Sequence, residues 1–114
     1  MVRKKVLIID DEKDFCLLMQ FYLSKKNCDV SISHTLREGL GIIAHEHQDV
    51  ILLDNNLPDG LGWPAAKGIL ETCPNAHLFL ISANKITVKP VFESNHCQVI
   101  EKPITISQID HVLE

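Results

Sequence analysis

The chain has 114 residues, of which 46% are hydrophobic and 23% charged, as is typical of a globular protein. Folding at this length buries about two-thirds of the surface of the unfolded chain. One domain over residues 1–114 therefore needs no disulfide bond or structural metal ion to be stable. The net charge of −4 gives no general attraction to nucleic acid or an anionic membrane. Apolar runs reach four or five residues, far below the roughly 18 that cross a bilayer. We expect a soluble, unprocessed cytoplasmic domain, either alone or cut from a longer chain.

The cysteines do not form a recognisable metal or disulfide pattern. They are spaced by 12, 45 and 24 residues and include no Cys-x-x-Cys pair. We expect reduced and mostly buried thiols. The four residues are Cys16, Cys28, Cys73 and Cys97.

Short aliphatic and β-branched runs alternate along the chain with segments of helical pattern. The predicted strands are Lys5–Asp10, Val30–Ser33, Val50–Asp54, Leu78–Ser82 and Val99–Glu101. The predicted helices are Asp14–Lys26, Thr35–His45 with a Thr cap, Trp63–Thr72 with Pro64 in its first turn, and Ile104–Glu114. A further segment, Ile86–Ser94, contains Pro90, which requires either a helix that starts there or an irregular loop.

This alternation predicts a parallel sheet with helices on both faces. In such a sheet the site lies outside the carboxyl ends of the strands. The residues at these ends are Asp10 and Asp11, Asp54, Ser82, and Lys102 before Pro103, whereas Pro58–Gly60 has the composition of a turn.

Three of these residues are carboxylates that neighbouring strands would bring close together. Like charges at short range raise one another's pKa and destabilise the site, so a cation must offset them. Mg²⁺ suits such a group of Asp10, Asp11 and Asp54, because it takes few protein ligands and keeps water and phosphate oxygens. A nucleophilic carboxylate, Mg²⁺, the Lys102 ammonium and the Ser82 hydroxyl are the parts needed to transfer a phosphoryl group to aspartate.

Four segments together resemble the receiver domain of two-component response regulators. They are Ile8–Glu12, Leu52–Gly62, Ile81–Ala83 and Glu101–Pro103, in family order and at family-like spacing. The resemblance implies a flavodoxin-like, doubly wound, five-stranded parallel sheet of order 2-1-3-4-5, with helices on both faces. It also implies a cis peptide bond before Pro103.

The resemblance implies a signalling role. Asp54 would accept a phosphoryl group from a histidine kinase or a phosphotransfer protein in a phosphorelay, and Ser82 and Lys102 would bind its oxygens. The signal would pass to an effector domain or protein. The domain would promote only its own phosphorylation and dephosphorylation, without turnover as an enzyme and without binding nucleic acid or membrane.

The same resemblance implies the metal ligands. Asp11 would ligate Mg²⁺ directly, with Asp10 nearby or acting through water. Asp54 and the backbone carbonyl of Asn56 would complete the set of protein ligands.

Two positions depart from the family pattern. Val99 stands where receivers commonly carry Tyr or Phe, and His96-Cys97 where many carry Gly-Ala. Val99 and the predicted segment Ile86–Ser94, which Pro90 interrupts, favour an alternative, a pseudo-receiver that acts as a phosphorylation-independent interaction module. The acidic pocket disfavours it, because carboxylates kept without a ligand to bind would only destabilise the fold.

Overall fold

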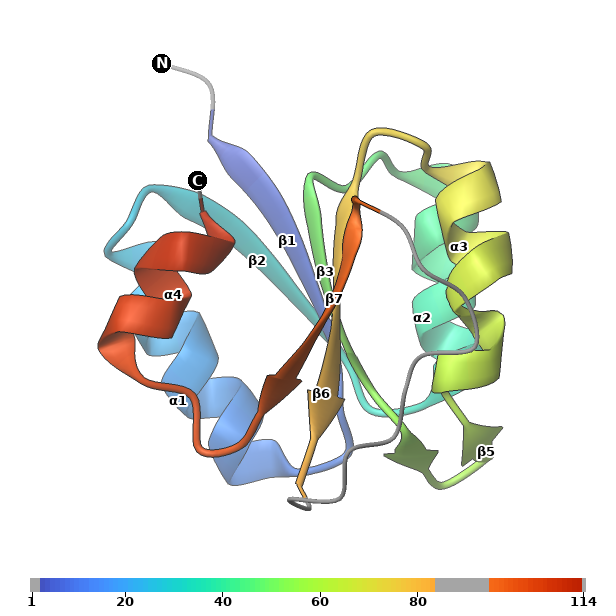
Figure 1. Ribbon diagram of the computed structural model, residues 1–114, viewed down its shortest axis with the longest axis horizontal. Coiled ribbons are helices and arrows are strands. Elements are labelled where there is room, and N and C mark those ends of the chain that lie inside the picture. The colour runs from blue at the N-terminus through green and yellow to red at the C-terminus, as the bar shows by residue number, and fades with distance from the viewer. Residues whose placement is uncertain (1–2, 84–94, 114) are drawn as a thin grey trace.

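A five-stranded parallel sheet forms the centre of the fold, and helices cover both of its faces (Figure 1). The structure is a computed structural model, and it describes residues 3–83 and 95–113. The strands lie in the order β2-β1-β3-β6-β7, which confirms the predicted doubly wound sheet. Their bounds are β1 Lys4–Ile9, β2 Cys28–Ser33, β3 Val50–Asp54, β6 His77–Ser82 and β7 Cys97–Glu101.

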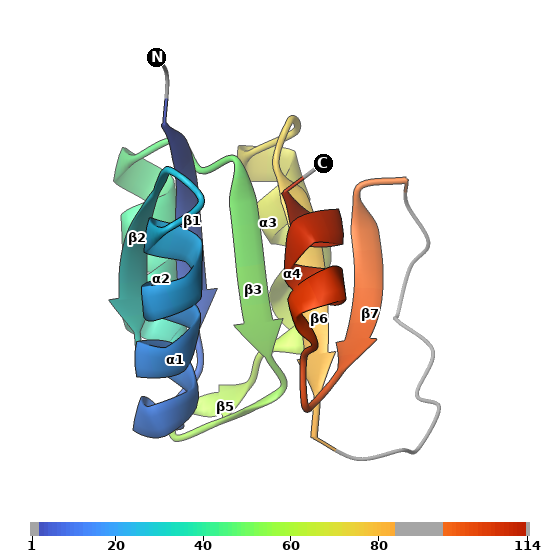
Figure 2. The same cartoon turned by 90° about the vertical axis from the view of Figure 1, so that its left-hand side faces the viewer.

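The helices form one layer on each side of the sheet. Helices α1 (Lys13–Ser24) and α4 (Ile106–Val112) lie on one face, and α2 (Leu36–His45) and α3 (Ala66–Thr72) on the other. Figure 2 shows α1 and α4 in front of the sheet. The 3-10 turn η1 (Trp63–Ala65) leads into α3, with proline at the start as the sequence predicts.

Each face of the sheet has its own apolar core. All five residues of β3 and the last four of β1 are buried, because a central parallel strand has helices on both sides. Alternate residues enter opposite cores. The core under α2 and α3 includes Leu7, Ile9, Ile51 and Leu53. The core under α1 and α4 includes Val6, Ile8, Val50 and Leu52.

Strands β1 and β6 begin one residue earlier than predicted, and β2 and β7 begin two residues earlier. β2 begins at Cys28 instead of Val30, and β7 at Cys97 instead of Val99. In both cases a buried cysteine starts the strand and an exposed polar residue follows, which interrupts the apolar run seen in the sequence. All four cysteines are free and buried, as expected.

Side-chain caps set the start of two helices. The predicted cap of α2 is confirmed, since the Thr35 side chain accepts a hydrogen bond from the Glu38 backbone N–H. α4 begins at Ile106, later than the predicted Ile104. Thr105 caps it, and the side chain of Gln108 accepts from the Thr105 N–H in return.

A short hairpin stands where the sequence predicts only a turn. β4 (Asn56–Leu57) pairs with β5 (Gly60–Leu61), and Gly60 has a φ of 141°, a conformation that favours glycine. The peptide bond between Lys102 and Pro103 is cis, as the resemblance implies. The predicted segment Ile86–Ser94 lies outside the described residues. In the parts of the chain that the structure describes, we find no helix long and apolar enough to cross a membrane.

Candidate functional site

Three carboxylates meet at the carboxyl ends of β1 and β3. Asp10 follows β1, Asp54 ends β3, and the parallel pairing of the two strands places these ends side by side. One carboxylate oxygen from each of Asp10, Asp11 and Asp54 lies within 4.8 Å of the other two. Asp10 and Asp54 are buried, and Asp11 is exposed. The structure therefore brings together the predicted acidic residues.

The buried position of Asp54 changes its acidity. Burial raises the pKa of the Asp54 carboxyl from 3.8 to about 6, and the negative charge of Asp10 acts in the same direction. Lys102 and a 2.9 Å hydrogen bond from the Asn55 backbone N–H to Asp54 Oδ1 oppose this rise without cancelling it. Ionisation of Asp54 therefore destabilises the folded domain, and a bound cation would reduce this destabilisation.

Lys102 lies at the end of β7 and reaches the same group. Its Nζ is 2.9 Å from Asp10 Oδ2 and 3.0 Å from Glu12 Oε2, and it lies 4.1 Å from the centre of the Phe15 ring. Burial acts to lower the pKa of Lys102, but the adjacent carboxylates of Asp10 and Glu12 outweigh burial and raise it. Among the described residues, no ion pair within 4.0 Å joins Lys102 to Asp54.

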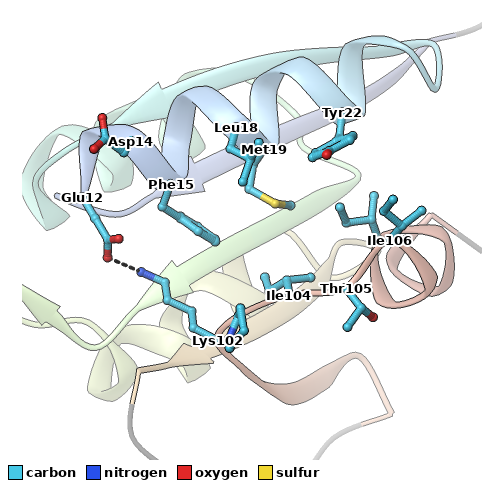
Figure 3. A pocket seen from close by; sticks show the side chains of 12 residues that line it. Glu12, Asp14, Phe15, Leu18, Met19, Tyr22, Lys102, Ile104, Thr105 and Ile106 are labelled. Carbon is cyan, nitrogen blue, oxygen red and sulfur yellow. Dashed lines mark hydrogen bonds and ion pairs between the residues drawn. The ribbon is translucent and has the colours of Figure 1, made fainter.

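The sequence prediction missed Glu12 as a member of the site. It is the third acidic residue in a row after β1, and this run was the available signal. Figure 3 shows Glu12 and Lys102 joined across the end of a groove, with Phe15 beside them.

Two other predicted residues lie at the same edge. Ser82 ends β6, the strand next to β3, and its carbonyl accepts a 2.8 Å hydrogen bond from the Lys102 backbone N–H. Asn56 is exposed and begins the β4–β5 hairpin, two residues after Asp54.

The chain after Asp54 is fixed by close backbone contacts. The Gly62 N–H donates to the Asn55 carbonyl at 2.8 Å, and the Trp63 N–H donates to Asn55 Oδ1 at 3.1 Å. A Cβ on Gly62 would lie 2.1 Å from the Asp54 carbonyl oxygen, so only glycine fits there. The sequence prediction assigned no role to Asn55.

The hairpin is also tied to α2. The carboxylate of Asp59 accepts hydrogen bonds of 2.8 and 2.9 Å from the backbone N–H groups of Leu36 and Arg37. These bonds hold the pKa of Asp59 below its usual range. They fix the position of the loop that follows the acidic cluster.

A groove of about 640 Å³ adjoins the cluster between α1 and α4 (Figure 3). Glu12 and Lys102 form one end of it, and its walls are mainly apolar. Leu18 and Ile106, both lining residues, are 53% and 59% exposed. The apolar lining comprises Phe15, Leu18, Met19, Tyr22, Pro103, Ile104, Ile106 and Ile109.

The donor set suits a hard divalent cation. The cluster offers carboxylate oxygens alone, and Mg²⁺ prefers oxygen ligands, of which one or two carboxylates commonly suffice. A cation at this position would also relieve the mutual repulsion of the three carboxylates. The residues present therefore fit the metal that the sequence predicts.

Comparisons with known proteins agree on one family. The sequence model of the response regulator receiver domain matches residues 6–114. The chain is 27% identical over 111 residues to the response regulator protein PilR of Pseudomonas aeruginosa, and the match covers 96% of this chain and 25% of PilR. The chain thus spans about a quarter of the length of this curated relative.

Solved structures share the fold. A CheY-like receiver domain protein from Methanospirillum hungatei JF-1 has a TM-score of 0.84 at 24% identity, covering 98% of this chain and 89% of that chain. A Burkholderia pseudomallei response regulator was solved with a phosphorylated aspartic acid, calcium ion and citrate. It has a TM-score of 0.82 at 21% identity, and the match covers 97% of this chain and 66% of that chain. With the family match and the acidic cluster at the sheet edge, this chain belongs to the response regulator receiver domains of two-component systems.

Proposed function

We propose that this domain accepts a phosphoryl group on Asp54 from a histidine kinase or a phosphotransfer protein in a phosphorelay. The observation that carries the proposal is the buried Asp54 carboxylate within 4.8 Å of Asp10 and Asp11, with Lys102 beside them. The test is treatment of the wild-type domain and of Asp54→Asn with Mg²⁺ and a small phosphodonor.

The proposed reaction is a direct displacement at phosphorus. A carboxylate oxygen of Asp54 forms a P–O bond while the P–N bond to the donor histidine breaks, and the electron pair of that bond stays on the imidazole nitrogen. Lys102 and Ser82 would donate hydrogen bonds to the oxygens of the transferred group. A phosphorylated domain of this kind signals by its changed state and is not a turnover enzyme.

Mg²⁺ is the proposed cofactor. Asp11, Asp54 and the Asn56 backbone carbonyl would hold it, with Asp10 nearby or acting through water. When bound, Mg²⁺ would neutralise negative charge on the phosphoryl oxygens. The chain's own part is to hold the three carboxylates in place, through the end of β1 and the tied loop after β3.

Asp11→Ala should weaken Mg²⁺ binding by about tenfold or more, since even changes outside the ligand shell cost that much. Asp11 is exposed, so its loss should leave the fold intact. A titration followed by the fluorescence of Trp63 measures the affinity. Asp14→Ala removes the same charge from an exposed position on α1 and is the control. Equal affinity of Asp11→Ala and wild type would show that the metal site is placed wrongly.

The groove between α1 and α4 is the proposed docking surface for the donor protein. A donor must bring its phosphohistidine to Asp54 and therefore covers surface next to the acidic cluster. The groove meets this requirement, because Glu12 and Lys102 belong to both the groove and the site. Its exposed apolar side chains, Leu18 and Ile106, suit the central contacts of a protein interface.

Leu18→Glu should slow phosphotransfer from a purified kinase that phosphorylates the wild-type domain, by about tenfold, the effect of losing one central interface side chain. Phosphorylation by acetyl phosphate should change far less, because this donor needs no protein surface. Leu17→Glu is a matched control, since Leu17 is 61% exposed on the same helix and does not line the groove. A larger loss for Leu17→Glu than for Leu18→Glu would contradict docking in the groove.

The proposal extends to the setting of the domain. We infer that residues 1–114 act as one receiver domain in the cytoplasm, and that the signal passes to an effector on the same or a separate chain. The alternative is a phosphorylation-independent pseudo-receiver. One observation favours it: Val99 is 42% exposed on the edge strand β7 and has no ring that could link the pocket to this surface.

A further inference from the structure

Glu12 binds the lysine that the proposed reaction needs. Lys102 Nζ lies 3.0 Å from Glu12 Oε2 and 2.9 Å from Asp10 Oδ2, and its third neighbour is the Phe15 ring. All three partners belong to the segment from the end of β1 into α1. Figure 3 shows the lysine directed to Glu12 at the mouth of the groove. Lys102 is thus held on the α1 side of the site.

An ammonium group has only three N–H donors, so the contacts of Lys102 compete with one another. A phosphoryl group on Asp54 would bring acceptor oxygens that bind a cation strongly. Two of these donors face Asp10 and Glu12, and among the described residues Lys102 has no ion pair with Asp54 within 4.0 Å, so reaching the phosphoryl oxygens requires the ammonium to move away from a present carboxylate partner. The Asp10 carboxylate is fully buried and costly to leave unpaired, whereas the Glu12 side chain is 61% exposed and can return to water. Glu12 is therefore the partner that can be exchanged.

We infer that Glu12 is a positioning residue that holds Lys102 in a resting place and competes with the phosphoryl group for it. The inference rests on the proposed function and adds a residue that restrains the reaction. Release of Lys102 from Glu12 accompanies phosphorylation, and the freed carboxylate then lies at the end of the groove. The ease of Asp54 phosphorylation depends on the strength of the Glu12–Lys102 ion pair.

The test compares phosphorylation rates with Mg²⁺ and acetyl phosphate. Glu12→Gln should be phosphorylated about two- to fivefold faster than wild type, the range expected from an exposed ion pair. Glu12→Asp keeps the charge but shortens the side chain, so it should also be faster. Asp14→Asn removes one charge at an exposed neighbouring position in the same groove, and it measures the simple effect of charge on an anionic donor. Its rate should rise less than that of Glu12→Gln.

A double-mutant cycle measures the contact itself, without any phosphodonor. Unfolding of wild type, Glu12→Gln, Lys102→Ala and the double variant should give a coupling of about two- to fivefold in the unfolding equilibrium. The equivalent cycle with Asp14→Asn should give no coupling.

The outcomes separate the inference from the proposed function. A Glu12→Gln domain that is slower than wild type, or no faster than Asp14→Asn, would overturn the inference, as would a Glu12→Asp domain that matches wild type. If the wild-type domain takes no phosphoryl group at all, the proposed function fails. The unfolding cycle then still decides whether Glu12 holds Lys102, because a coupling of zero would show that the two side chains form no stabilising ion pair.

Discussion

Acetyl phosphate and Mg²⁺ should add one phosphoryl group to the wild-type domain and none to Asp54→Asn. The small donor needs no kinase, because the site itself supplies the carboxylate nucleophile, the cation position and the nearby ammonium of Lys102. Mass spectrometry should show a single phosphate-sized increment. The product should be an acyl phosphate, which hydroxylamine removes.

Variants of Lys102 and Ser82 separate the proposed roles of these two side chains. Lys102→Ala should be phosphorylated far more slowly, since one donor aimed at oxygens where negative charge develops typically contributes about 10²–10³ in rate. Ser82→Ala should keep most of the phosphorylation and lose mainly the conformational response. A folded, Mg²⁺-binding domain that gains no increment would identify the chain as a pseudo-receiver.

The sheet could be predicted because its signal is local. Val6–Ile9 and Val50–Leu53 are continuous apolar runs, and such runs of this length indicate buried parallel strands. Once the strands are placed, the position of the acidic residues follows from topology, because parallel strands end at one edge. Asp10 and Asp54 therefore meet in the structure as predicted.

The missed features depend on contacts that form only in the folded chain. Glu12 reaches Lys102 across 90 positions of the chain, and the pairing depends on how β7 lies against the start of α1. Gly62 is required because the hairpin folds it onto the Asp54 carbonyl, and only the turned chain shows that approach. The two-residue strands β4 and β5 are too short to carry an alternating pattern.

Asp54→Asn should make the metal-free domain more stable at pH 7. The pKa of Asp54 is about 6 in the folded state, against 3.8 for the ordinary group, so the folded domain binds this proton more tightly than the unfolded chain. Stability therefore falls as the pH rises from about 4 to 6, and the whole penalty is present above 6. Two pKa units correspond to about 3 kcal/mol, an upper bound for the gain. Asparagine cannot ionise and keeps the shape of the side chain.

Thermal unfolding in the presence of a chelator measures this effect. At pH 7 the gain should raise the Tm of Asp54→Asn above that of wild type by about 10 °C, and the difference should shrink as the pH falls towards 4. Asp29→Asn, at an exposed position on β2, should show no comparable gain.

Addition of Mg²⁺ and removal of the Lys102 charge test the same electrostatic balance in opposite directions, since the first should raise the Tm and the second should lower it. Mg²⁺ should raise the Tm of wild type more than that of Asp54→Asn, because the cation offsets the charge that the variant lacks. Lys102→Ala should lower the Tm, since the raised pKa of Lys102 shows that its charged form stabilises the fold at every pH below about 10.

A metal-free Asp54→Asn domain that melts below wild type at pH 7 would contradict a cluster of repelling carboxylates at the end of β3. The cation requirement of the site would then lose its physical basis.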